Sequence, residues 1–140
     1  MRRSIFLPLT FVAVLTLATM ACDSGEDTPT TPTTPGPTVT ETFAGTVTLN
    51  GAATFTFNTN LAGIVNATLR TIGPVTTTQV GMALGTWNGV TCAVQLANDR
   101  ITAGTAVTGQ VNAAGALCVR VYDVGQLTET STFEIVVVHP

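Results

Sequence analysis

The side chains that could take part in chemistry are few in this chain of 140 residues, which holds one histidine and three cysteines. A Ser-His-Asp site would have to combine His139 with Ser131, the only serine after residue 40. Two residues so close along one strand and loop are poor partners for a catalytic triad. A zinc site needs three or four ligands close together, and one histidine with Cys92 and Cys118 does not supply them, because these two cysteines are expected to be oxidised to a disulfide. The sequence therefore predicts a protein that is not an enzyme.

A weaker candidate for metal binding lies in the tripeptide Asn98-Asp99-Arg100. A carboxylate such as that of Asp99 is a suitable ligand for a hard cation such as calcium. The alternative is a turn with a local charge pair between Asp99 and Arg100. Apart from this candidate ion, we expect neither a metal nor a cofactor.

Two aromatic residues are candidates for ligand contact, Trp87 beside Asn88-Gly89 and Tyr122 near the C-terminus. Exposed aromatic rings on one face would form a stacking platform for a carbohydrate, whereas burial of Trp87 would count against this. The alternative is that Trp87 is a core or rim residue that flanks a hairpin.

The charge of the chain restricts its partners. Only 9% of the residues are charged, the net charge is −3, and there are five basic residues, all of them arginine. A nucleic-acid-binding domain needs a basic surface, so we expect no nucleic-acid partner.

The first 21 residues have the composition of a secretory signal peptide. Arg2 and Arg3 precede an apolar run from 5 to 20, which is short for a membrane span, and small residues follow at Ala18 and Ala21. The alternative is a permanent N-terminal anchor helix. A signal peptide predicts export of the remaining chain.

The run Thr19-Met20-Ala21-Cys22 resembles the lipobox of bacterial lipoproteins. The resemblance implies that residues 1–21 are removed and that Cys22 is acylated, which would anchor the chain in a membrane of the cell envelope. Two or more acyl chains hold a protein firmly at a bilayer, where one does so only marginally. The alternative is ordinary cleavage after Ala21, which would leave a secreted protein with a spare thiol.

Residues 22–40 form a linker rich in threonine and proline. Its first apolar residue after Cys22 is Val39, so it cannot bury a core of its own. Proline at this spacing favours extended polyproline II, and the linker would hold the following domain away from the membrane.

Residues 41–140 predict one all-β domain, because apolar residues recur with period two between threonines. Asn50-Gly51 and Asn88-Gly89 separate alternating runs and tolerate the backbone of tight hairpin turns. The spacing of the turns predicts an antiparallel β-sandwich of seven or eight strands. The side chains expected to face inward include Phe55, Phe57, Val65, Ala67, Leu69, Val80, Met82, Leu84, Val94, Leu96, Leu117, Val119, Val121, Phe133, Ile135 and Val137.

The cysteines of this domain, Cys92 and Cys118, predict a disulfide, since a pair in an exported domain is usually oxidised. Closing a loop of 26 residues would contribute about 3.5 kcal/mol in the chain-entropy model. Cys92 shares the phase of Val94, predicted inward, whereas Cys118 alternates with inward residues. A β-bulge near Cys92 would restore a common face. The alternative is two free thiols.

The last strands resemble those of bacterial pre-peptidase C-terminal domains. Gly115, the run 119–122 (VRVY) and the run 133–137 (FEIVV) carry this resemblance, which extends over about residues 41–140. It implies a jelly-roll-like β-sandwich, and some domains of that family bind collagen or calcium. The acidic residues here form no evident cluster, so we do not expect calcium on this ground.

These observations predict a lipid-anchored, non-catalytic β-sandwich module outside the cytoplasm, with a role in adhesion, extracellular binding or envelope structure. Its partners would be the membrane, through the N-terminal lipid, and an extracellular protein or polysaccharide. The alternative function is a carbohydrate-binding module that uses Trp87 and Tyr122.

Overall fold

The computed structural model describes residues 36–140. The predicted signal peptide (1–21), the lipidation site Cys22 and most of the linker lie outside the described residues. The first strand begins at Val39, two residues before the expected domain boundary at 41.

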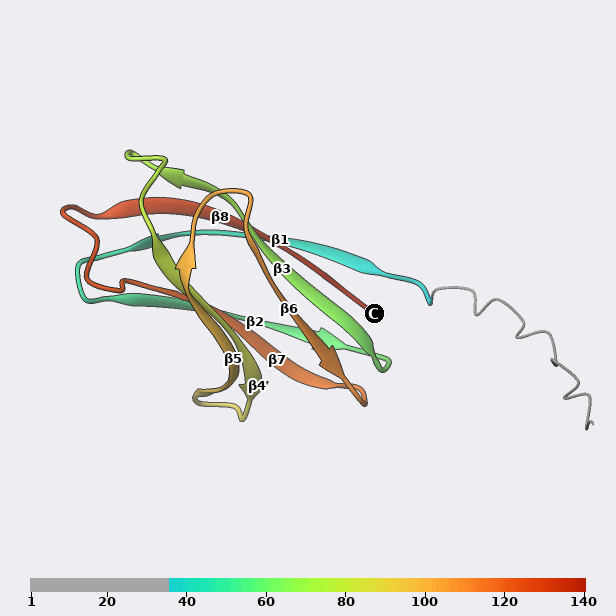
Figure 1. The fold of residues 1–140 in the computed structure, drawn as a ribbon. Coiled ribbons are helices and arrows are strands. Elements are labelled where there is room, and N and C mark those ends of the chain that lie inside the picture. The colour runs from blue at the N-terminus through green and yellow to red at the C-terminus, as the bar shows by residue number, and fades with distance from the viewer. Residues whose placement is uncertain (1–35) are drawn as a thin grey trace, which may run out of the picture. The chain divides into compact units, whose positions relative to one another are not determined.

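The described part of the chain is all-β, as predicted (Figure 1). Within it there is no helix with the length and apolar character that a membrane crossing requires. The eight strands are β1 (Val39–Val47), β2 (Ala52–Thr59), β3 (Gly63–Gly73), β4 (Val80–Trp87), β5 (Cys92–Ile101), β6 (Ala106–Val111), β7 (Gly115–Tyr122) and β8 (Ser131–His139).

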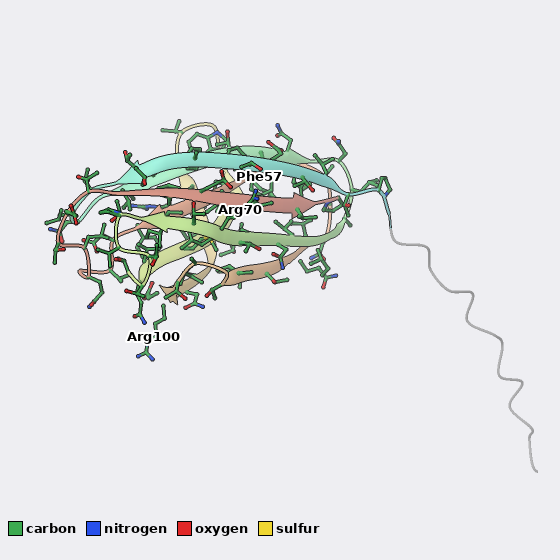
Figure 2. The ribbon with its side chains drawn as sticks, turned by 90° about the horizontal axis from the view of Figure 1, so that it is seen from above. Phe57, Arg70 and Arg100 are labelled. Carbon is green, nitrogen blue, oxygen red and sulfur yellow. A yellow bond between two sulfur atoms is a disulfide. The ribbon has the colours of Figure 1, made fainter. Side chains whose placement is uncertain are left out.

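The strands form a sandwich of two antiparallel sheets. One sheet has the order β1-β8-β3-β6 and the other the order β2-β7-β4-β5. Strands β1, β8 and β3 lie side by side in one layer, as the view from above shows (Figure 2). The last strand is central, because β8 pairs with β1 along its whole length and with β3 on its other side.

The core lies between the two sheets and consists of the alternating apolar residues, as the period of two predicts. Phe57, Val65, Leu69 and Ile135 are each at most 3% exposed. The inward side of β7 is also as predicted, and its alternate residues Leu117, Val119 and Val121 are all buried.

The prediction for Asn50-Gly51 was wrong in part. Asn50 does adopt a positive φ of 54°, but strands β1 and β2 on either side belong to different sheets. This turn therefore carries the chain across the sandwich. Asn88-Gly89 does join paired strands, β4 and β5, and Gly89 has a φ of 96°.

The prediction that Val94 faces the core was also wrong, because Val94 is 45% exposed on the outer face of the sheet, whereas Leu96 does face inward and is 43% exposed. Strand β5 is an edge strand, and its register against β4 shifts between Val94 and Leu96. An extra residue at such a shift moves the following side chains to the other face of the sheet. Val94 therefore lies opposite Gly85 on the outer face, and Leu96 lies opposite the core residue Leu84.

Candidate functional site

The open side of the sandwich contains an apolar groove of about 410 Å³ between the edge strands β5 and β6. Its floor is formed by the core residues Val65, Leu84 and Leu117, which contribute from both sheets. Its walls carry Leu96 from β5 and Val111 from β6. The remaining lining residues are small or uncharged, namely Gly85, Thr86, Gln95, Gly109, Gln110, Asn112, Ala113, Ala114, Gly115 and Ala116.

The two sides of the sandwich are closed to different degrees. Between β1 and β2, the rings of Phe43 and Phe55 stack with centroids 5.2 Å apart, and Phe133 meets Phe55 edge-on at 6.1 Å. Between β5 and β6, closure depends on Leu96, which lies over Gly109. A Cβ on residue 109 would stand only 2.8 Å from Leu96 Cδ1, so the leucine side chain occupies that space. The groove continues from there towards the β6–β7 turn.

The chemistry of the groove is that of binding. Apolar floors with a few amide groups on the rim are typical of ligand sites, and the volume is in the usual range for such sites. Gln95, Gln110 and Asn112 supply amide donors and acceptors at the rim. The groove thus suits an uncharged, apolar ligand.

The predicted disulfide between Cys92 and Cys118 is confirmed, with Cα atoms 5.8 Å apart. The register shift in β5 places both cysteines on the outer face, as the bulge hypothesis required. Strand β4 lies between β5 and β7 in the sheet, so the bridge crosses over it at Gly85, which is opposite Cys118. A side chain at Gly85 would collide with the backbone of Ala93.

Trp87 and Tyr122 lie on the same outer face but far apart, and both are half-buried. Tyr122 is opposite Gly81, six residues before Trp87 on β4, which corresponds to about 20 Å along the strand. The structure therefore does not bring the two rings together into a single stacking platform.

Tyr122 belongs to a polar cluster with Asp99 and Arg120. Its hydroxyl donates a hydrogen bond to Asp99 Oδ1, and the Arg120 guanidinium lies 6.0 Å from the centre of its ring. Burial of the phenol, followed by its hydrogen bond to Asp99 and the negative charge of that residue, raises the pKa of Tyr122 to about 12.

The prediction of a turn at Asn98-Asp99-Arg100 was wrong, because these residues belong to β5. The register against β4 shifts here as well. Asp99 bonds to Tyr122 instead of pairing with Arg100, whose side chain projects away from the body of the molecule (Figure 2). Asp99 is not part of any group of three or more metal-binding side chains within residues 36–140.

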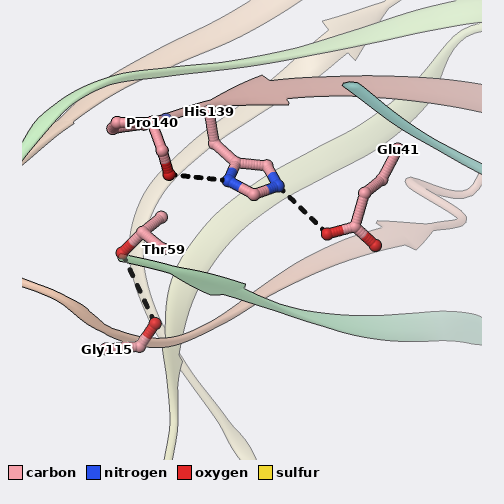
Figure 3. A network of polar contacts seen from close by, with 5 residues as sticks. All are labelled: Glu41, Thr59, Gly115, His139 and Pro140. Carbon is pink, nitrogen blue, oxygen red and sulfur yellow. Dashed lines mark hydrogen bonds and ion pairs between the residues drawn. The ribbon is translucent and has the colours of Figure 1, made fainter. Parts of the chain in front are cut away.

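His139 is 2% exposed and faces the core at the end of β8 (Figure 3). Its Nε2 lies 3.0 Å from Glu41 Oε1 and its Nδ1 lies 3.1 Å from the Pro140 oxygen. Each ring nitrogen of His139 therefore has an oxygen partner. Ser131 stands at the opposite end of β8, about 27 Å away by the strand rise, so the structure does not bring these two residues together.

The sequence patterns did not predict the groove. Its residues carry no reactive groups, and the run Asn112-Ala113-Ala114-Gly115 is the one local signal, since four small residues leave space at the end of a strand. The position of this run against β4 and β5 depends on the topology of the sheets. Compared with known proteins, the chain matches no family model, and no curated protein matches it significantly.

Proposed function

We propose that the protein is a non-catalytic binding module of the bacterial cell envelope, held at a membrane by acylated Cys22 and contacting its partner through the groove between β5 and β6. The observation that carries this proposal is the uncharged, largely apolar lining of a groove of about 410 Å³ on the open side of the sandwich. A binding site of this kind needs shape and apolar contact, and it needs no reactive side chain.

The architecture supports a jelly-roll assignment within this proposal. Eight strands in the orders β1-β8-β3-β6 and β2-β7-β4-β5 are the arrangement expected of two interlocked Greek keys. This is the architecture that the resemblance to pre-peptidase C-terminal domains implies, and we propose that the domain is of that kind.

The attachment is tested by mass spectrometry of the protein isolated from its own membranes. We expect an N-terminus at Cys22 that carries fatty acyl groups, with residues 1–21 removed. An unmodified Cys22, or a chain that retains residues 1–21, would contradict the anchor.

The contact surface is tested by placing a photo-crosslinking amino acid at Val111, inside the groove, and separately at Val90. Val90 is 80% exposed in the β4–β5 turn and lies outside the groove, so it is a matched control. We expect crosslinked adducts in intact cells from position 111 and few from position 90. Equal yields from the two positions, or none from 111, would show that the groove is not the contact surface.

A second candidate function is carbohydrate binding along the outer face of the β2-β7-β4-β5 sheet. The observation that favours it is that Trp87 and Tyr122 share this face, where a polysaccharide chain could run from one ring to the other. It predicts that Trp87→Ala and Tyr122→Ala each weaken co-sedimentation with an insoluble polysaccharide such as peptidoglycan. Unchanged sedimentation of both variants would exclude it.

A further inference from the structure

The groove lies between two sheet edges that differ in regularity. Strand β5 shifts register against β4 twice, once near Gln95 and once near Asp99 and Arg100. Register shifts and charged side chains are features that keep an edge strand from pairing with further chains. The edge formed by β5 is therefore a poor place for an additional strand.

The edge formed by β6 has none of these protections. Residues Ala106–Val111 pair one to one with β3, without a shift in register, and include neither a charged residue nor a proline. Among the described strands, β3 is the neighbour of β6, so the other side of β6 is a free row of backbone donors and acceptors. A regular, uncharged edge of this kind is a template for strand addition.

The inward side of β6 opens directly onto the groove. Gly109 lies opposite the core residue Val65 and has no side chain, and Val111 is only partly buried. A strand added next to β6 would continue this sheet across the mouth of the groove. Its alternate side chains would then point towards Leu84 and Leu96 of the opposite sheet.

We propose that the groove binds an extended, uncharged segment of a partner polypeptide, which adds to the sheet beside β6 and inserts alternate apolar side chains into the groove. This inference rests on the proposed function, because it takes the groove as the contact surface. The free backbone edge favours a polypeptide over a compact apolar molecule, since only another backbone satisfies a row of N–H and C=O groups. The uncharged lining favours a neutral segment, because burying an unpaired charge there would be costly.

The test uses the full chain in phosphatidylcholine nanodiscs and a short synthetic peptide in which valine and threonine alternate. Lysine outside the alternating part keeps the peptide soluble. We expect the peptide to slow amide hydrogen exchange in residues 106–111, where strand addition would protect the free edge. A peptide with the same side chains but methylated on alternate backbone nitrogens should not bind, because it cannot form the ladder. Binding of both peptides alike, or protection elsewhere but not in β6, would overturn the proposal.

Variants of the protein test the same proposal by changing the groove instead of the peptide. Val111→Lys should weaken binding of the peptide about tenfold or more by placing a charge in the groove. Ile64→Lys is the matched control, because Ile64 is 57% exposed on the neighbouring strand and does not line the groove. Ala113→Lys, at the exposed turn that borders the groove, should reproduce the effect if Val111→Lys fails to fold. Equal affinities of the charged groove variants and the control would overturn the proposal.

The experiment separates this inference from the proposed function. Crosslinks from position 111 in cells, together with no protection of β6 by the peptide, would leave the groove as a contact surface and would overturn strand addition alone. An absence of crosslinks together with peptide protection of β6 would overturn the cellular role and leave strand addition intact.

Discussion

At the scale of single residues, the polar side chains that the structure describes serve mainly to hold the fold. Asp123 is the clearest case, because one carboxylate joins two loops. Its Oδ2 accepts the N–H of Asn50 at 2.9 Å, and its Oδ1 accepts those of Gly125, Gln126 and Leu127 at 2.8 to 3.2 Å. The bond from Asn50, followed by those from the loop, lowers the pKa of Asp123 below its usual value.

Asp123→Asn should destabilise the domain by about 1 kcal/mol, since the loops lose bonds to a charged acceptor. The pKa of Asp123 is lower in the folded chain than in the unfolded chain, so its contribution is present above about pH 4 and lost as the pH falls further. The variant should therefore lose less stability than the wild type on acidification. Urea unfolding at several pH values measures both effects. Glu129→Gln, which removes an equal charge from an exposed position, is the control, and an identical acid response of Asp123→Asn and wild type would contradict the prediction.

Tyr122 gives a second residue-scale prediction that is simple to measure, because it is the single tyrosine of the chain. Ultraviolet absorbance of the phenolate should show a midpoint near 12 in the folded protein and near 10 after denaturation. A raised pKa of this kind adds stability below pH 10 that disappears as the pH rises from about 10 to 12.

Asp99→Asn should lower the midpoint of Tyr122 only part of the way towards 10. The variant removes the negative charge of Asp99, whereas burial of the phenol, the largest cause of the shift, remains. A midpoint near 10 in the folded wild type would show that the hydroxyl is neither buried nor bonded to Asp99.

At the scale of strands, β5 shows why alternation alone placed Val94 on the wrong face of the sheet. Its sequence alternates like that of the core strands, but two register shifts and an edge position expose both of its faces. Period two identifies a strand and its two faces. It does not reveal which strand lies at an edge, because the neighbours of a strand are set by distant parts of the chain.

The close approach of β5 to β4 leaves no room for a side chain at Gly85. The disulfide draws the start of β5 over β4, and the backbone of Ala93 occupies the space above Gly85. Gly85→Ala should cost about 2 kcal/mol or more, because backbone atoms cannot move aside as a flexible side chain can. Thermal unfolding under non-reducing conditions measures this loss. Gly115→Ala is the matched control, because no atom lies within 4 Å of the added Cβ. Similar losses in the two variants would refute the close approach.

At the scale of the whole molecule, the sequence was sufficient for the fold class and for most of the core. Alternation predicted the inward residues of five strands, β2, β3, β4, β7 and β8, and the composition of the domain predicted the disulfide. The crossing at Asn50-Gly51 and the groove could not be predicted, because both depend on which strands share a sheet. The chemical character of the groove residues did not predict the groove either, since apolar and small side chains occur both in a core and in a binding site.

The unequal closure of the two sides of the sandwich leads to a prediction for the whole domain. Phe55→Ala should cost about 2 to 3 kcal/mol, because its ring packs against Phe43 and Phe133 and closes the β1–β2 side. Leu96→Ala should cost about 1 kcal/mol or less, because Leu96 is 43% exposed and its removal only widens a groove that is already open.

Urea unfolding of both variants, with the m-value checked for each, distinguishes these costs. If Leu96→Ala destabilises the domain as much as Phe55→Ala, then the β5–β6 side is part of the core and leaves no room for a partner. If it costs little, the domain keeps its stability on the aromatic side and leaves the other side free for binding. The stability and the binding of this sandwich would then reside on opposite edges of the same two sheets.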